Sequence, residues 1–513
     1  MDTREPTQTQ VDRDSADLAK FGYKQELKRS LRFFSSFAVA FSYISPSTGI
    51  FTLYWLGLGT IGGVFFWTWP IVAAGQFIIA LNFAEVSSHF PIAGSVFQWT
   101  KYLSTRTHAW FNGWIYLFAG VITVTAVVVT LPIALIPFLN GIGWHIANST
   151  SNNILIAAIT LALITLLNVY GVRLVAIVNN TGVIFEILGM VIFAVFLVAL
   201  HNHQGPGVIF KTGGQSLTFS TFMAAMFMSL FVIYGMDTAS TLAEETKDPR
   251  REAPKAVLSS VAGAFVIGAI FLWGTLIAIP SLKATIAKSG SDPYGVLPGI
   301  IEQNFSRAFA TTYLFVVSAA IFVCCLAIMT STIRLCFGMA RDNQLPFSRS
   351  LARVNPRLHT PILSCLAIGA LAGIPMIQFA GAGYIAIAAT GMIYLSYAIG
   401  NVAIMRARLK GWPKTRAPFR LGKWGPVVNV LGLAWGVGML VNFAIPRACC
   451  NPKPNQTAGL LHIGPLNGIP ILWTVAAVVV VIGFVYWALV QRHKTFAPLV
   501  PPEEEVLPEG AGV

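Results

Sequence analysis

The sequence predicts an all-α membrane protein that crosses the bilayer many times. Hydrophobic residues make up 55% of its 513 positions and charged residues only 11%, whereas soluble domains carry about 25% charged residues. The mean hydropathy is +0.69, and apolar segments of spanning length recur along the whole chain. A net charge of +14 would suggest nucleic-acid binding in a soluble protein, but membrane topology accounts for the basic residues here, and we expect no nucleic-acid partner.

Twelve segments are long and apolar enough to span a membrane, which takes about 20 residues as a helix. The third is long, and we expect it to be tilted. The predicted spans are residues 33–57, 61–84, 109–139, 153–170, 174–200, 219–243, 256–280, 311–336, 362–379, 383–405, 426–446 and 470–490.

The distribution of basic residues predicts the orientation, because cytoplasmic loops are rich in Lys and Arg. Residues 1–32 are polar and contain no apolar core of a cleaved signal peptide. We therefore predict a cytoplasmic N-terminal tail (1–32) and a cytoplasmic C-terminal tail (491–513). With this orientation the basic residues outside the cell are few: Lys211, Lys283, Lys288, Arg307, Arg447 and Lys453.

Glycosylation sequons agree with this topology. Asn148, Asn304 and Asn455 each begin a sequon in a predicted external loop, while Asn179 begins one inside the fifth span.

The spans divide into two repeats of five, each of which opens with an interrupted helix. The transporter core (33–405) would hold a first repeat at 33–200 and a second at 219–405. Because five is odd, the second repeat enters the membrane with inverted polarity, as in many transporters. Residues 426–490 would add two further helices.

The first interruption is Ser45-Pro46-Ser47-Thr48-Gly49, in the middle of span one. Pro46 lacks an N–H and disfavours helical geometry at the residue before it. The half-helix that follows would present free N–H groups and a positive dipole end, which suit a carboxylate. The alternative is a proline kink whose backbone is satisfied by the neighbouring serine side chains.

The second interruption is Tyr234-Gly235-Met236-Asp237, in span six. Gly235 allows a bend, and the unwound carbonyls there can accept hydrogen bonds from an ammonium group. Phe231 or Tyr234 can cover a substrate or offer a cation–π face, or can simply pack in the helix. Asp237 either binds the substrate amine or caps the second half-helix.

Glu186 lies in the middle of span five, with no basic residue near it in the sequence. Ionisable groups at this depth are costly and are usually functional, so Glu186 is a candidate proton carrier. The alternative is a carboxyl group that fixes helix packing.

Other polar groups fall near the cytoplasmic ends of spans or in span eight. We expect Glu85, Arg334, Glu244 and Glu245 to form an inner gate or to extend to the interface. The hydroxyls of Thr330, Ser331 and Thr332 are sodium candidates, although hydroxyls that bond back to their own helix are commoner. No residue pattern implies a cofactor or any other metal.

A family resemblance rests on five motifs of this chain. These motifs are Gly22–Arg29, Thr48–Ile50, Ala84–Gly94, Glu244–Pro254 and Ala340–Pro346. Together they resemble the amino acid–polyamine–organocation (APC) transporter superfamily, and most of all its amino acid/choline branch, which includes GABA permeases. The resemblance implies the five-plus-five fold of the bacterial leucine transporter.

The resemblance also implies roles for the residues at both interruptions. Ser47, Thr48 and Gly49 would bind the substrate carboxylate, with Ser45 beside them, and carbonyls of Phe231, Val232 and Tyr234 would bind the amine. Two positions depart from the family. Several proton-coupled relatives have a lysine where this chain has Glu186, and Thr238–Ala243 lacks the Ala-His-Met-Ser pattern of the GABA/choline branch.

These observations predict a plasma-membrane permease for amino acids or amines such as GABA, driven by a proton or sodium gradient. A choline or polyamine permease and an amino acid exchanger of the same fold remain alternatives. The lipid bilayer is an expected partner, and we infer no obligatory partner protein.

A major-facilitator protein would have a long central loop, a channel would have a charged or carbonyl ring, and an enzyme would have clustered nucleophiles or metal ligands. None of these is evident in the sequence.

Overall fold

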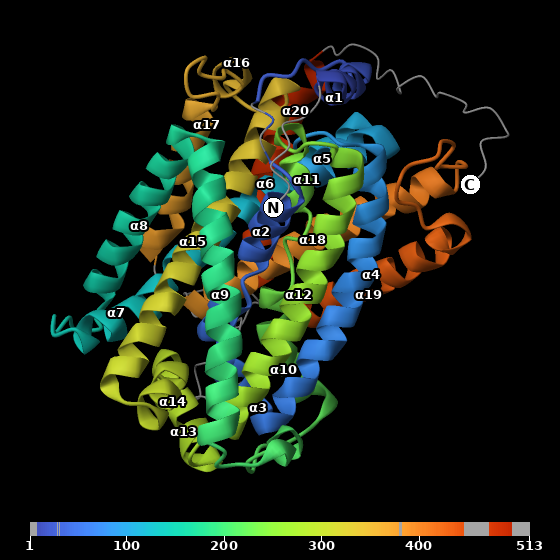
Figure 1. Cartoon of the computed structure of the whole chain (residues 1–513). Helices are drawn as coiled ribbons and strands as arrows, with labels where there is room; N and C mark the ends of the chain where they lie inside the picture. The colour runs from blue at the N-terminus through green and yellow to red at the C-terminus, as the bar shows by residue number, and fades with distance from the viewer. Residues whose placement is uncertain (1–7, 28, 30, 379–381, 446–470, 495–513) are drawn as a thin grey trace.

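The computed structural model describes residues 8–27, 29, 31–378, 382–445 and 471–494. Within these ranges the chain is a bundle of helices (Figure 1), and the one β pairing is an isolated parallel bridge between Leu31 and Thr246.

The helices of the first half are listed here in chain order. They are α1 (Gln8–Lys20), α2 (Phe33–Ile44), α3 (Pro46–Ile61), η1 (Gly62–Trp67), α4 (Thr68–His89), α5 (Ser95–Leu103), α6 (Arg106–Val128), α7 (Leu131–Gly141), α8 (Thr150–Tyr170), α9 (Val172–Leu200) and η2 (Pro206–Phe210).

The second half continues from Phe219. Its helices are α10 (Phe219–Val232), α11 (Thr238–Thr241), η3 (Ala243–Glu245), α12 (Pro249–Ile277), α13 (Leu282–Ser291), η4 (Pro293–Gly295), α14 (Val296–Asn304), α15 (Arg307–Arg341), α16 (Ser348–Leu351), α17 (Ile362–Gly373), η5 (Pro375–Gln378), α18 (Ala382–Arg408), η6 (Gly422–Trp424), α19 (Gly425–Ala444), α20 (Ile471–Leu489) and η8 (Gln491–His493).

Nine helical stretches of the described chain are long and apolar enough to cross a membrane. The longest, Phe33–His89, contains 57 residues and includes α2, α3 and α4. Two shorter apolar helices, α10 and α17, accompany them. The protein is therefore a polytopic, nearly all-helical membrane protein.

Three of the differences between the predicted spans and the helices have a local cause. Span two was expected to begin at residue 61, but α4 begins at Thr68, because η1 intervenes. A Cβ atom on Gly62 would lie 2.1 Å from the backbone carbonyl oxygen of Thr212, and a Cβ atom on Gly63 would lie 2.1 Å from that of Val208. The close approach of this loop holds the glycines outside a regular helix.

Prolines explain the other two differences. Span three, expected as one helix at 109–139, comprises α6 and α7, and Pro132 stands in the first turn of α7, where its missing N–H is tolerated. Span nine was expected to reach residue 379, but α17 ends at Gly373, just before Pro375, because Pro disfavours helix at the preceding residue. Residue 379 lies outside the described residues.

The packing brings both halves of the chain into one core. Helix α18 packs on α6, α12 on α4, and α10 on α3. In Figure 1, α8 lies at one edge of the bundle and α19 at the other, with α2, α10 and α11 between them. Since α2–α3 and α10–α11 contain the two predicted interruptions, these lie in the centre of the protein.

The four sequons fall in different surroundings. Asn148 is exposed, whereas Asn179 is buried in α9. Asn304 is also buried, and its amide nitrogen donates to the carbonyls of Ala278 and Ile300 at 2.9 and 2.8 Å. A glycan on Asn304 is incompatible with these bonds. Asn455 lies outside the described residues.

Candidate functional site at two helix breaks

The first break lies between α2 and α3. Helix α2 ends at Ile44, Ser45 adopts a left-handed conformation with φ +35°, and α3 begins at Pro46. A positive φ is unusual for a residue with a side chain. Pro46 occupies the first position of α3, where its fixed φ favours helix and its missing N–H costs nothing. The chain therefore starts a new helix in the interior of the bundle.

A carboxylate from another helix occupies this helix start. Oε1 of Glu186, on α9, accepts hydrogen bonds from the hydroxyls of Ser45 and Ser47 at 2.7 and 2.6 Å, and from the backbone N–H of Ser47 at 3.3 Å. Glu186 is only 2% exposed. Its negative charge faces the positive end of α3, which stabilises it.

Glu186 has no counter-cation among the residues that the structure describes. The titratable groups around it are the hydroxyl of Tyr313 and the thiol of Cys324, both on α15. The structure thus brings together Ser45, Ser47 and Glu186, which the sequence analysis had assigned to two separate roles.

The other N–H groups at the start of α3 also have internal partners. Thr48 N donates to the Ser45 hydroxyl at 3.4 Å, and Gly49 N donates to the Ser45 carbonyl at 3.2 Å. These are the groups expected to bind a substrate carboxylate. In this conformation a substrate could bind there only by displacing Glu186 and Ser45.

Gly49 also lies tightly against α10. A Cβ atom on Gly49 would lie 2.4 Å from Cγ2 of Val232, a distance at which the helices would have to separate. The first break therefore packs directly on the helix that leads into the second.

The second break lies between α10 and α11. Helix α10 ends at Val232, Gly235 has φ +89°, and α11 begins at Thr238. The Gly235 N–H donates to the hydroxyl of Tyr397 at 3.0 Å. A Cβ atom there would lie 1.9 Å from the ring of Tyr43, so only glycine fits. No hydrogen bond to the carbonyl oxygens of Phe231 and Tyr234 occurs among the described residues.

Asp237 follows this break and is fully buried. Its Oδ2 accepts from the hydroxyls of Ser95 and Tyr116, each at 2.6 Å, and its Oδ1 accepts from the hydroxyl of Tyr397 at 2.5 Å. Its side chain makes no capping bond to α11, so the capping alternative is wrong. The three donors come from α5, α6 and α18, and no local sequence pattern points to them.

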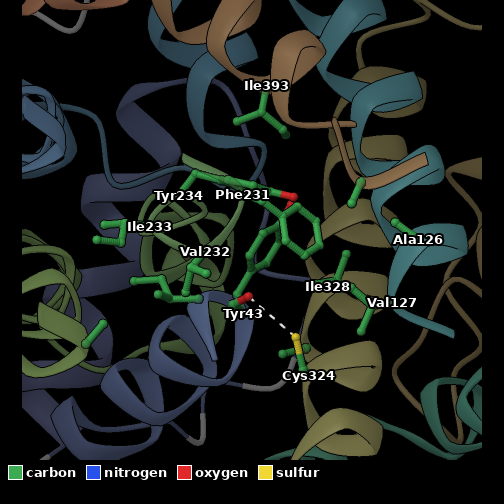
Figure 2. Packing of buried hydrophobic residues seen from close by; sticks show 14 of the residues in the cluster. Tyr43, Ala126, Val127, Phe231, Val232, Ile233, Tyr234, Cys324, Ile328 and Ile393 are labelled. Atoms are coloured by element: carbon green, nitrogen blue, oxygen red, sulfur yellow. Dashed lines mark hydrogen bonds between the residues drawn. The ribbon is translucent and has the colours of Figure 1, made fainter. Parts of the chain in front are cut away.

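Aromatic and aliphatic side chains fill the space between the two breaks (Figure 2). Tyr43 from α2 and Phe231 from α10 both lie edge to face with Tyr234, with ring centroids 6.1 Å apart in each pair. Ile328 from α15 and Ile393 from α18 border the same region. The three aromatic residues are at most 5% exposed, so this region is closed to solvent.

The sodium candidates point elsewhere. The Thr330 hydroxyl has two acceptors within reach of its single hydrogen, Asn168 Oδ1 at 2.8 Å and the Leu326 carbonyl of its own helix at 2.7 Å. The Thr332 hydroxyl donates to the Ile328 carbonyl. The Ser331 hydroxyl contacts the hydroxyls of Thr238 and Thr241. In the described chain none of these hydroxyls bonds to the α2–α3 break.

Buried ion pairs close the end of the bundle predicted to be cytoplasmic. Arg334 lies 2.8 Å from Glu245, with both side chains 1% exposed. Arg341 makes a two-bond contact with Glu244 at 2.6 and 2.9 Å. Two further buried pairs join Lys101 to Asp342 and Arg408 to Glu85. The residues expected to form an inner gate or to extend to the interface are thus paired inside the protein.

The segment between α1 and α2 lies over this closed end. The Tyr23 hydroxyl donates to Asp342 at 2.7 Å, and its ring lies 3.9 Å from the Arg341 guanidinium. Leu31 pairs through its backbone with Glu245 and Lys247. The N-terminal region predicted as a polar tail therefore contributes to the closure.

Comparison with known proteins identifies the family. The sequence model of the family described as "Amino acid permease" matches residues 31–463. The chain is 27% identical to the amino-acid permease BAT1 of Arabidopsis thaliana, over 95% of this chain and 97% of that protein. It is 23% identical to the GABA-specific permease of Saccharomyces cerevisiae, over 84% and 78% of the two chains, and 24% identical to the choline transporter of the same yeast, over 87% and 81%.

A solved structure shares the fold. The crystal structure of MhsT in complex with L-phenylalanine, a protein of the leucine-transporter fold, matches with a TM-score of 0.58 at 12% identity, over 81% of this chain and 99% of that chain. These relatives are named as permeases and transporters rather than enzymes. The chain therefore belongs to the amino acid permease family of the APC superfamily, a family of multi-pass membrane transporters.

Proposed function

We propose that this protein is a secondary active permease that moves amino acids or related amines, such as GABA, across the plasma membrane by alternating access. The observation that carries the proposal is the meeting of two helix breaks in the protein interior, each beside a buried carboxylate. Broken helices in a membrane protein are tolerated where they are buried or line a cavity, and they form transporter binding sites. The relatives named as an amino-acid permease and a GABA-specific permease support the same class of substrate.

The span count of this proposal is twelve. The stretch Phe33–His89 is long enough for two crossings, and α10 and α17 would complete spans six and nine. Helices α2–α3 and α10–α11 would then be the discontinuous first helices of two inverted repeats, and α19 and α20 the additional pair. The termini would be cytoplasmic, next to the buried ion pairs.

We further propose that Glu186 couples transport to protons. An ionised Glu186 holds the N–H end of α3, which is where a substrate carboxylate would bind. Two carboxylates at one site repel each other, so one of them must be protonated for both to remain. Protonation of Glu186 would free the start of α3 for the substrate, which links the entry of one proton to the binding of one amino acid. Sodium coupling has weaker support, because Thr330 and Ser331 bond to other partners.

A cation without a carboxylate is the second candidate substrate. Glu186 and Asp237 are buried, and neither forms an ion pair with Lys, Arg or His within the described residues. Three aromatic rings lie nearby and can bind a quaternary ammonium group. A choline-like substrate would balance these charges without competing for the start of α3.

Uptake into proteoliposomes tests both candidates. Purified protein would be supplied with radiolabelled GABA, L-phenylalanine, choline and spermidine under imposed pH or sodium gradients. We expect saturable uptake of an amino acid that is stimulated by an inward proton gradient. Uptake of choline alone would favour the second candidate, and the absence of uptake of every compound would contradict the proposed function.

A further inference from the structure

The loop that joins α18 to α19 carries a concentration of positive charge. Between residues 406 and 424 the sequence contains no Asp or Glu. Its basic residues are Arg406, Arg408, Lys410, Lys414, Arg416, Arg420 and Lys423. We call residues 406–424 the basic loop, and the predicted topology places this loop on the cytoplasmic side of the membrane.

A buried carboxylate on α4 holds both ends of the basic loop. Glu85 is fully buried, and it pairs with Arg408 through Oε2 and accepts the N–H of Leu421 through Oε1 at 2.9 Å. The hydroxyl of Ser88, one turn further along α4, accepts the N–H of Phe419 at 3.1 Å. The basic loop is therefore fixed to the last turns of α4.

An aromatic contact fixes the middle of the basic loop. The ring of Trp412 lies 5.1 Å from the ring of His89, at the end of α4. On the same tryptophan, the Arg408 guanidinium lies 5.2 Å from the ring centroid. Arg408 is thus part of the attachment, and its side chain is only 5% exposed.

The remaining basic side chains of the loop face water. Those of Arg406, Lys410, Lys414, Arg416, Arg420 and Lys423 are exposed. None of them forms an ion pair with any residue that the structure describes. On α12, by contrast, Arg251 pairs with Asp248 and Lys255 with Glu252. Membrane topology explains Lys and Arg in a cytoplasmic loop, but it does not require that acidic neighbours be absent.

Two apolar side chains show where the basic loop meets the membrane. Leu409 directly follows α18 and is 83% exposed, and Trp424 directly precedes α19 and is 62% exposed. Tryptophan is enriched at the boundary between membrane and water. Since α19 packs beside α4 at an edge of the bundle (Figure 1), lipid can reach these helix ends. The cations between them therefore lie at the level of the lipid headgroups.

We propose that the basic loop binds the phosphate-bearing headgroups of anionic lipids in the cytoplasmic leaflet. Clusters of about four to eight Lys and Arg next to a membrane helix are typical of such sites, and charged donors bind phosphate oxygens strongly. Leu409 and Trp424 favour a lipid over free phosphate or an acidic peptide, because they add apolar contacts with the acyl chains.

Lipid bound to this loop would also act on transport, a consequence that rests on the proposed function. The loop joins α4 to α18, and α18 contains Tyr397, whose hydroxyl accepts the N–H of Gly235 and donates to Asp237. The basic loop is therefore connected through one helix to the second break. We expect uptake to be faster in vesicles that contain anionic lipid.

The experiment compares two full-length variants with the same loss of charge. The loop variant carries Lys414→Gln, Arg416→Gln and Arg420→Gln. The control variant carries Lys20→Gln, Arg251→Gln and Lys255→Gln, which replace exposed cations that each pair with an acidic residue nearby. Native mass spectrometry of the detergent-solubilised proteins counts bound phosphatidylserine and phosphatidylcholine, and melting points check folding.

Wild-type protein should bind phosphatidylserine in preference to phosphatidylcholine, and high salt should weaken the preference because salt screens exposed charges. The loop variant should bind phosphatidylserine roughly tenfold to a hundredfold more weakly, since each basic residue near an anionic surface contributes to the attraction. The control variant should bind nearly as well as the wild type. Inorganic phosphate should not displace the lipid.

Uptake is then measured in vesicles of phosphatidylcholine alone and of phosphatidylcholine mixed with phosphatidylserine. Equal binding of the two lipids by the wild type, or an equal loss in the loop and control variants, would overturn the inference. So would binding of a peptide of the acidic residues 495–513 in place of the lipid. If uptake persists in both kinds of vesicle in that case, the proposed function stands and only the lipid site fails.

Discussion

The carboxylate of Glu186 lies 2.6 Å from the hydroxyl of Ser47, at the first turn of α3. This contact joins residues that are 139 positions apart in the sequence. It places a titratable group on the N–H end of a helix that begins inside the protein. A change in the charge of Glu186 therefore changes what holds α3 in place.

Glu186→Gln should remove the pH dependence of substrate affinity. A glutamine oxygen can still accept from the serines but cannot take up a proton. If the substrate carries a carboxylate, wild-type affinity should increase as external pH falls, because protonated Glu186 no longer competes for α3. The variant should have high affinity at every pH. Uptake KM measured from pH 5 to 8 would check this, and a variant that keeps the wild-type pH response would exclude Glu186 as the proton site.

Gly49→Leu should abolish uptake without loss of folded protein. Even the Cβ of an alanine would approach Val232 to 2.4 Å, so Gly49→Ala should already reduce uptake by forcing α3 away from α10. Gly263→Ala is the control, since its Cβ would meet Phe41 at an ordinary 3.5 Å. Uptake together with size-exclusion profiles separates transport from folding. Normal transport by Gly49→Leu would mean that the site is misplaced.

The sequence contains local signals for the helix ends at the two breaks but not for their partners. Pro46 and Gly235 act on their own backbone, so the ends of α2 and α10 could be predicted from neighbouring residues. The hydroxyls of Tyr116 and Tyr397 reach Asp237 from helices that are more than 100 residues away. No periodicity or motif encodes such contacts, because they depend on how distant helices pack.

The contacts of loops and the partners in buried ion pairs could not be predicted from the sequence either. The start of α4 is set by contact of Gly62 with Thr212, which lies far along the chain. The place of Arg334 near the cytoplasmic end of a span predicted an inner gate or extension to the interface, but Glu245, its partner in the structure, was one of several acidic residues near such ends. Tertiary structure was needed to choose among them.

Arg334→Leu should destabilise the protein strongly. It would leave the Glu245 charge buried without a partner, and removal of one member of a buried pair costs about 3–5 kcal/mol. The double variant Arg334→Leu with Glu245→Leu should recover part of that loss. Lys255→Gln should change little, because its pair with Glu252 is exposed and exposed pairs contribute about 0–1 kcal/mol. Thermal melting of detergent-solubilised protein ranks the variants, and equal melting points for Arg334→Leu and the wild type would refute the prediction.

Tyr397→Phe should slow transport more than it lowers stability. The Tyr397 hydroxyl accepts from Gly235 N–H and donates to Asp237, so it ties α18 to both sides of the second break. Hydrogen bonds to charged groups contribute about 1.5–3 kcal/mol, so the loss corresponds to roughly a tenfold to hundredfold decrease in uptake rate if the bond holds the transport geometry.

Tyr313→Phe is the control for this change, because it removes a buried hydroxyl that has no hydrogen-bond partner among the described residues. Initial rates of uptake at saturating substrate, with melting points of the same preparations, would separate the two effects. If Tyr397→Phe transports at the rate of Tyr313→Phe, the Tyr397 hydroxyl contributes only to packing and the prediction is wrong. A selective fall in rate would instead show that alternating access depends on the bond between α18 and the carboxylate of Asp237.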